Sequence, residues 1–136
     1  MQWSQIVGHG TQHDWFLNAM QQGRLATSFL FVGPDGIGKR TFAKMLTKSL
    51  LCRQTPVVHL DACGKCEDCA QVEASTHPDL IELCKPADKS FLPLDLLIGE
   101  QESRMREGLC HDISLRPYGG RRKVAIIDDA DYLNAE

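Results

Sequence analysis

The stretch that decides the fold is SFLFVGPDGIGKRT, residues 28–41. Its first part, Ser28–Val32, is a short apolar run rich in strand-forming side chains, which predicts a buried strand. Glycines at positions 33, 36 and 38 predict a tight turn directly after it. Residues Lys39–Leu51 then carry apolar side chains at helical spacing. The predicted inner face of that helix consists of Phe42, Ala43, Leu46 and Leu50.

The turn has the spacing of a phosphate-binding loop, with Gly33 and Gly38-Lys39 separated by four residues. In such a loop the backbone N–H groups and the following helix N-terminus face phosphate oxygens, and the lysine reaches the outer phosphates. We therefore predict a site for ATP that also includes Gly36 and Thr41. The alternative is an ordinary glycine turn with an exposed lysine.

Arg40 stands where a magnesium-binding loop carries Ser or Thr. A guanidinium group cannot ligate Mg²⁺. The hydroxyl of Thr41 is one residue further along the helix, a rotation of about 100°, so it should face away from the metal. We expect ATP hydrolysis to be weak or absent. The alternative is that water replaces the missing ligand and activity survives.

A second acidic element follows the apolar run Lys123–Ile127, which predicts a strand that ends at Asp128-Asp129. The pattern resembles a Walker B motif, in which the first carboxylate lies beside Mg²⁺. Asp129 occupies the position that usually holds the catalytic Glu, and its shorter side chain should end about 1.5 Å short of the usual place. The alternative is an acidic helix start.

Three cysteines, Cys63, Cys66 and Cys69, recur at every third position, and Cys52 lies a short way upstream. Four thiolates in tetrahedral array are the set that closes a structural zinc site. An iron–sulfur cluster uses similar spacing, and disulfides are rare in the cytoplasm. His59 and His77 are alternative ligands, although surface or turn roles suit them better. Cys84 and Cys110 are expected to be buried or half-buried thiols outside the site.

The rest of the chain predicts helices alternating with strands, and hence a parallel doubly wound sheet. Further helices are expected at 11–22, 67–74 and 99–113, and a further strand at 80–84. The first of these should bury one face, made of Trp15, Phe16, Ala19 and Met20. A formal net charge of -3 argues against a protein that grips DNA with its own surface. Without a long apolar run or a signal peptide, the expected location is the cytoplasm, away from membranes.

Several motifs together resemble the bacterial clamp-loader subunits of the AAA+ P-loop family. They are Ile6-Val7-Gly8 before a helix, Gly23-Arg24-Leu25 before the first strand, the cysteine insertion after the loop helix, His77-Pro78-Asp79, and Leu115-Arg116-Pro117. The resemblance implies a three-layer parallel sheet with an inserted zinc module at 52–69. It also implies that the backbone of Ile6, Val7 and Gly8 lies beside the adenine. Residues 1–136 would form the N-terminal part of the AAA+ domain.

Within that family, Gly38-Lys39-Arg40 and Asp128-Asp129 are typical of the delta-prime class and not of the gamma/tau ATPases. The resemblance then implies a subunit of the DNA polymerase III clamp loader, partnered with gamma/tau and delta. Through the complex it would serve the sliding clamp and primed DNA. The alternatives are an active gamma/tau-type ATPase, or a zinc-bearing nucleotide kinase, which would need an arginine-rich lid.

The family's arginine finger, sensors, lid and collar would follow Glu136, so the domain is expected to be incomplete. A central strand of the sheet would also follow that point. We therefore expect marginal stability of this chain, or pairing of its exposed sheet edge with another copy.

Overall fold

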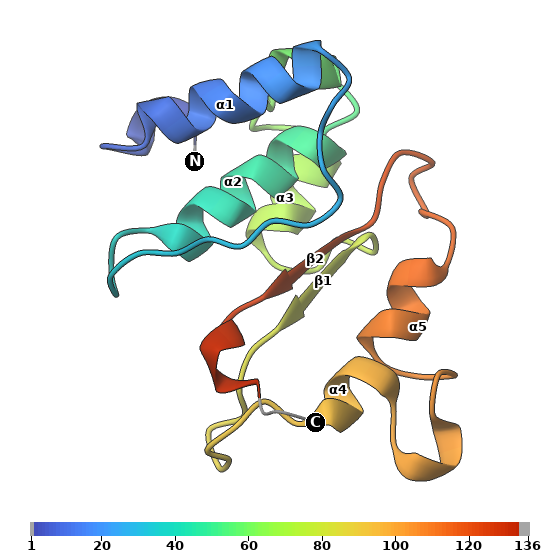
Figure 1. Cartoon of the computed structure of the whole chain (residues 1–136). Coiled ribbons are helices and arrows are strands. Elements are labelled where there is room, and N and C mark those ends of the chain that lie inside the picture. The colour runs from blue at the N-terminus through green and yellow to red at the C-terminus, as the bar shows by residue number, and fades with distance from the viewer. Residues whose placement is uncertain (1, 134–136) are drawn as a thin grey trace. The chain divides into compact units, whose positions relative to one another are not determined.

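The computed structural model describes residues 2–133 and divides the chain into two compact units, Met1–His77 and Pro78–Glu136. The first is helical, and the second holds a two-stranded sheet (Figure 1). Together they form a small mixed α/β chain. Among residues 2–133, no helix is long and apolar enough to span a bilayer.

The first unit is built on α2, Lys39–Leu51, whose bounds are those predicted from the sequence. Its C-terminal half is buried almost completely, and α3, Glu67–Glu73, lies beside it (Figure 1). The first helix, α1, spans Gly10–Gln21 and buries only Phe16 and Met20. These two side chains lie four residues apart, on one stripe of the helix. The prediction that Trp15 shares this face is wrong, since Trp15 is 65% exposed.

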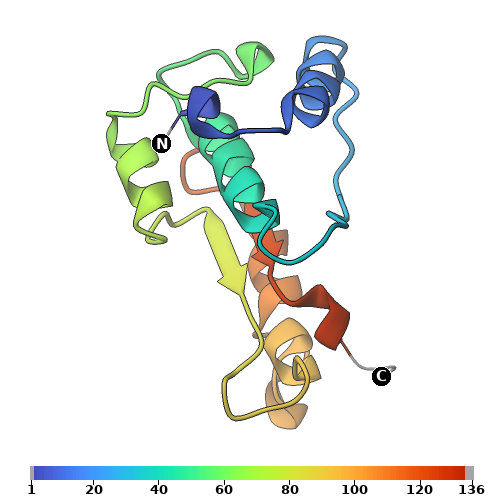
Figure 2. The same ribbon diagram turned by 90° about the vertical axis from the view of Figure 1, so that its left-hand side faces the viewer.

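Two 3-10 turns complete the first unit: η1, Trp3–Gln5, and η2, Val57–His59. Figure 2 shows η1, in dark blue, lying against α2. Aromatic rings join α1, α2 and the 28–32 segment, because Phe16 contacts Phe29 and Phe42 at centroid distances of 4.8 and 5.7 Å. This aromatic cluster holds α2 in the unit.

The buried strand predicted at Ser28–Val32 is not present. The segment has no strand assignment, and Leu30 and Val32 are 78% and 85% exposed. A strand needs the backbone of a neighbour to complete its hydrogen bonds. Within residues 2–133, the only named sheet is the pair β1–β2, and residues 28–32 are not part of it. The larger three-layer sheet implied by the resemblance is therefore not seen here.

The second unit contains the parallel pair β1, Leu80–Leu83, and β2, Val124–Ile127, with Leu80 opposite Val124 and Leu83 opposite Ile127. Both strands lie within one residue of their predicted bounds, and the parallel pairing confirms that part of the α/β prediction. Asp79 precedes β1 and is 1% exposed. Its carboxylate accepts hydrogen bonds from the backbone N–H groups of Tyr118 and Gly119, at 2.6 and 2.8 Å. Asp79 thereby fixes the loop that leads into β2.

The single helix predicted at 99–113 is wrong. The chain instead forms α4 at Leu94–Ile98, the 3-10 turn η3 at Gln101–Ser103, and α5 at Leu109–Ser114. Gly99 and Gly108 have φ of 85° and 86°, outside the helical region. A Cβ atom on Gly108 would lie 2.7 Å from the backbone nitrogen of Gly99, so the two glycines close the base of a loop between α4 and α5.

The last short element is η4, the 3-10 turn Ala130–Tyr132, which follows β2 directly. The backbone N–H of Leu92 donates to the carbonyl oxygen of Tyr132 at 2.8 Å, and Leu92 itself is 1% exposed. Leu92 and Leu109 are the buried hydrophobic residues of this unit in the described part of the chain. The second unit is thus held by a small core around a short sheet.

Candidate metal centre and phosphate loop

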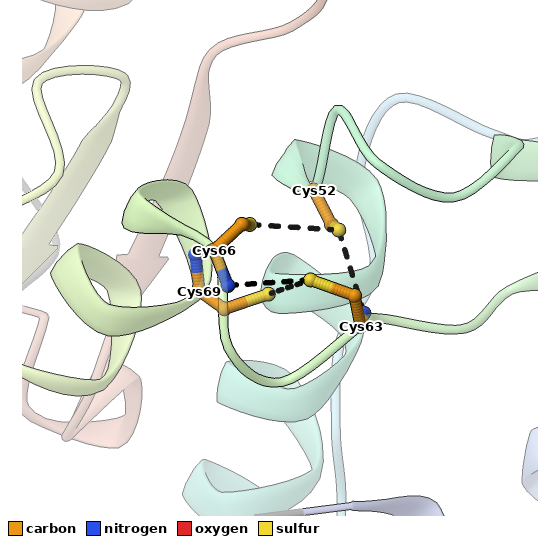
Figure 3. Close-up of side chains that lie close together, drawn as sticks. All are labelled: Cys52, Cys63, Cys66 and Cys69. Atoms are coloured by element: carbon orange, nitrogen blue, oxygen red, sulfur yellow. Dashed lines mark hydrogen bonds between the residues drawn. The ribbon is translucent and has the colours of Figure 1, made fainter.

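The four predicted metal ligands lie together in the first unit (Figure 3). Cys52 directly follows the last residue of α2, and Cys63 lies in the loop that leads towards α3. Cys66 is the N-cap of α3, and Cys69 lies in its first turn. The four Sγ atoms all lie within 4.8 Å of one another. The sequence prediction that these four side chains converge is confirmed.

The spacing of the sulfurs suits a tetrahedral ion. With Zn–S bonds of about 2.3 Å, the corners of a tetrahedron lie about 3.8 Å apart. The Sγ atoms of Cys52 and Cys66 are 3.9 Å apart, and so are those of Cys63 and Cys69. A disulfide needs sulfurs about 2 Å apart, and all six cysteines are free thiols. The donor set fits a closed four-sulfur metal site, although its occupancy by zinc stays a prediction.

Backbone N–H groups point at the sulfurs, as expected around thiolates. Cys63 N–H donates to Cys52 Sγ at 3.5 Å, and Cys66 N–H donates to Cys63 Sγ at 3.3 Å. Burial favours the neutral thiol of Cys52, but hydrogen bonds from the Cys63 backbone and the Thr55 side chain outweigh it and lower its pKa to about 6. Burial raises the pKa of Cys69 well above its usual range.

An ion pair between exposed Arg53 and buried Asp68 supports the cysteine loop. Asp68, between Cys66 and Cys69, accepts two hydrogen bonds from the Arg53 guanidinium at 2.9 and 3.0 Å. Hydrogen bonding to Arg53 lowers the pKa of Asp68 despite its burial. His77 Nε2 lies 3.4 Å from Asp68 Oδ1, and the ring is 6% exposed. His77 therefore packs beside the module and is not among the clustered ligands, and exposed His59 is not among them either.

The two cysteines outside the cluster are more exposed than expected. Cys84 follows the end of β1 and Cys110 is the second residue of α5, and both are exposed. The prediction that these two thiols are buried or half-buried is therefore wrong.

The predicted phosphate loop forms a turn held by its own lysine. Gly36 and Gly38 have φ of 77° and 97°, values that favour glycine. Lys39 Nζ donates to the carbonyl oxygens of Gly33 and Pro34 at 2.6 and 3.1 Å. Arg40, the next residue, is exposed. The turn precedes the N-terminus of α2, as a phosphate loop requires.

His9 was not singled out from the sequence, yet it joins the N-terminal segment to this loop. Its Nε2 lies 2.8 Å from the carbonyl oxygen of Ile37, and its ring contacts Phe42 at 6.0 Å between centroids. No local pattern marks this contact, because the partners lie 28 residues apart.

The segment before His9 lines a hollow beside the loop. Its volume is about 450 Å³. The lining residues are Gln5, Ile6, Val7, His9, Ile37, Gly38 and Thr41. Ile6 and Val7, predicted to lie beside the adenine, therefore line one cavity together with Gly38 and Thr41, predicted to lie near the phosphates. Gly8 lies between two of the lining residues, and the roles of all of them in nucleotide binding stay predictions.

Asp128 and Asp129 lie at the carboxyl end of β2 in the second unit, as predicted. Asp128 N–H donates to the carbonyl oxygen of Leu83 at 2.7 Å. Asp129 has φ of 55°, in the left-handed region, and Lys85 N–H lies 3.4 Å from its carboxylate. The predicted phosphate loop belongs to the first unit, and the two aspartates belong to the second.

The comparisons with known proteins agree with these motifs. A family model described as "DNA polymerase III, delta subunit" matches residues 8–136. DNA polymerase III subunit delta' of Pseudomonas aeruginosa is 30% identical over 132 residues, covering 97% of this chain and 33% of that protein. Subunit tau/gamma of Haemophilus influenzae is 31% identical over 117 residues, covering 86% and 15%. Subunit gamma/tau of Mycoplasma genitalium is 26% identical over 132 residues, covering 97% and 20%. The chain thus spans a third or less of these relatives.

Proposed function

The chain belongs to the DNA polymerase III delta-subunit family, and from that premise we propose that it acts as a delta-prime-type clamp-loader subunit. In this proposal it supports the ATP-dependent loading of the sliding clamp onto primed DNA. Its direct partners are the gamma/tau and delta subunits, and it meets the clamp and DNA through the complex. Its net charge of -3 agrees with an indirect role at DNA.

The proposed fold is the N-terminal part, residues 1–136, of an AAA+ P-loop domain with a three-layer parallel sheet. The zinc module, residues 52–69, is an insertion after α2. The support is the order of elements: a glycine loop opens α2, the cysteines follow it, and two parallel strands come later. Four cysteine ligands leave no open position on the ion, so its role is structural.

For ATP we propose the loop and hollow described above. The N–H groups of the turn at 33–38 would surround phosphate oxygens, and the Lys39 ammonium would neutralise charge on the outer phosphates. The backbone of Ile6, Val7 and Gly8 would lie beside the base. Asp128 would hold Mg²⁺, which would neutralise charge on the outer phosphates when bound.

The observation that carries the delta-prime proposal is the identity of two residues. Arg40 follows Lys39 and brings a cation, not a hydroxyl, to the position where P-loop enzymes ligate Mg²⁺. Asp129 replaces the longer Glu, and its carboxylate lies against the Lys85 backbone. Both departures lower the rate of hydrolysis without removing the groups that bind phosphate, so we propose a weak or inactive ATPase.

The second candidate is an active gamma/tau-type ATPase subunit. It is favoured by the gamma/tau relatives, whose identity to this chain, 26% and 31%, is similar to the 30% of the delta' relative. The two candidates differ in whether this chain turns ATP over by itself.

The test uses the full-length protein that contains this chain, reconstituted with gamma/tau, delta and the clamp from the same organism. We expect ATP-dependent clamp loading onto primed DNA when all subunits are present. Loading should continue when this subunit carries Lys39→Ala, because the other subunits supply hydrolysis. The isolated subunit should show little ATPase activity.

Arg40→Thr is the matched variant, since it restores the hydroxyl and should raise Mg²⁺-dependent turnover. Robust turnover by the unmodified subunit, abolished together with loading by Lys39→Ala, would favour the gamma/tau role. Failure to join the complex would reject both candidates.

A further inference from the structure

One short segment, Trp3–His9, contacts both the cysteine centre and the hollow beside the phosphate loop. Trp3 and Ile6 pack against the core cluster of Met45, Cys52, Ala62 and Cys69. Ile6 also lines the hollow, together with Val7 and His9. Ile6 therefore both lines the hollow and packs against the buried cluster that includes Cys52 and Cys69.

Trp3 is the anchor of this segment. Its indole Nε1–H donates to Ser49 Oγ at 3.0 Å, and Ser49 is fully buried on α2. Its ring also lies edge-on to Phe42 and His13, at centroid distances of 5.0 and 4.6 Å. These contacts fix the ring from α1 and α2 at once.

The position of Trp3 determines that of Ile6. Ile6 N–H donates to the Trp3 carbonyl oxygen at 3.0 Å and closes the turn η1. Gln5 Oε1 accepts from Gln2 N–H at 2.8 Å and reinforces the same turn. Because this hydrogen bond closes a short turn, a displacement of Trp3 also displaces Ile6.

We propose that Trp3 is a positioning residue that couples the metal state of the four-cysteine centre to the order of the wall Trp3–His9. This inference rests on the proposed function for the metal and the nucleotide. When four thiolates hold one cation, Cys52 and Cys69 are held in place, and with them the buried cluster on which Trp3 and Ile6 pack. Without the cation, no bonds through a shared ion join the four sulfurs, so the buried cluster on which the wall packs loses that cross-link.

The experiment compares hydrogen exchange in zinc-loaded and chelator-stripped protein kept under reductant, with zinc content measured in each sample. Stripping should raise exchange in the cysteine loop and also, at least about five-fold, at the amides of residues 3–9. Adding zinc back should restore protection in both places. A rise confined to residues 52–73 would overturn the inference.

Two variants separate coupling from simple loss of structure. Trp3→Ala should retain zinc but exchange quickly at residues 4–9 in either metal state. Trp3→Phe keeps an aromatic ring and should retain part of the metal dependence. Trp15→Phe, on α1 and 65% exposed in the native protein, should behave like the unmodified protein.

The Trp15→Phe protein also provides an optical readout, because Trp3 is then the sole tryptophan. Its emission should shift to longer wavelength on stripping and return with zinc. A sample that binds no zinc rejects the metal part of the proposed function, and the inference with it. Zinc binding with unchanged exchange at residues 3–9 rejects only the inference.

Discussion

Lys39 and Cys52 stand at opposite ends of one helix: Lys39 opens α2, and Cys52 follows its last residue. A helix of 13 residues is about 20 Å long. The same rigid element therefore orients the lysine of the proposed phosphate loop and the first cysteine of the four-cysteine cluster. A substitution at either end of α2 should therefore change the free energy of unfolding of the whole first unit.

Loss of a cysteine from the cluster should destabilise the chain through loss of the metal. Cys69→Ser should lower zinc content and the free energy of unfolding by about 4 kcal/mol, the linkage expected for a ligand at a thousand times its Kd. Cys110→Ser, at an exposed thiol outside the cluster, should change stability by less than about 0.5 kcal/mol. Urea denaturation with zinc analysis measures both. Equal effects of the two substitutions would contradict the metal site.

The ion pair between Lys48 on α2 and Glu73 on α3 should make the free energy of unfolding depend on pH below neutrality. A hydrogen bond from buried Lys48 lowers the pKa of Glu73 to about 2. Because this pKa is lower in the folded than in the unfolded protein, the ionised Glu73 stabilises the fold at pH values above about 4.3, the unfolded-state pKa. That contribution is lost as the pH falls towards 2. Because Glu73 is 45% exposed, we expect about 1 kcal/mol.

The measurement is the difference in unfolding free energy between the native protein and Glu73→Gln from pH 7 to 3. The difference should shrink as pH falls. Glu73→Gln should also be less harmful when combined with Lys48→Met, which removes the buried ammonium. A pH-independent difference would show that Glu73 does not carry the effect.

His9 should stabilise the phosphate loop through its contact with the Ile37 carbonyl oxygen. His9→Ala removes a hydrogen bond worth about 1 kcal/mol, so exchange of the amides at residues 36–38 should rise about five-fold. His59→Ala, at an exposed histidine in the same unit, is the control and should leave these amides unchanged. Unaltered exchange in His9→Ala would mean that the loop holds its conformation without this residue.

Among the carboxylates of the second unit, we expect the replacement of Asp79 to lower the free energy of unfolding most. Asp79→Ala leaves the N–H groups of Tyr118 and Gly119 without their acceptor, at a cost of about 2 kcal/mol. Asp88→Ala, at an exposed position, should be nearly neutral. Thermal unfolding distinguishes them, since about 2 kcal/mol corresponds to roughly 7 °C in a chain of this size. Similar Tm values for the two variants would contradict the assignment.

The helices and strands with strong local signals were predictable. The bounds of α2 follow from Gly38 and from its apolar spacing, and β1 and β2 are regular apolar runs. Residues 28–32 also form a regular apolar run and therefore look like a strand. Strand formation, however, depends on a neighbouring backbone to pair with, and the apolar run alone does not show whether one is present. The 99–113 prediction failed because Gly99 and Gly108 take positive φ and its apolar face is weak.

The four-cysteine cluster was predictable because three of its members lie close together in the sequence. The spacing of Cys63, Cys66 and Cys69 identifies the centre. Contacts made over longer separations leave no such pattern. Trp3 reaches Ser49 across 46 residues, and Asp68 lies 3.4 Å from His77 in a pairing that depends on how α3 is placed. These links emerge only from the folded chain.

The most direct test of the account is X-ray absorption at the zinc edge, with metal analysis, on protein purified under reductant without added metal. We predict one zinc per chain with four sulfur neighbours at about 2.3 Å. Protein that is folded but free of zinc, or zinc held mainly by nitrogen and oxygen, would contradict it.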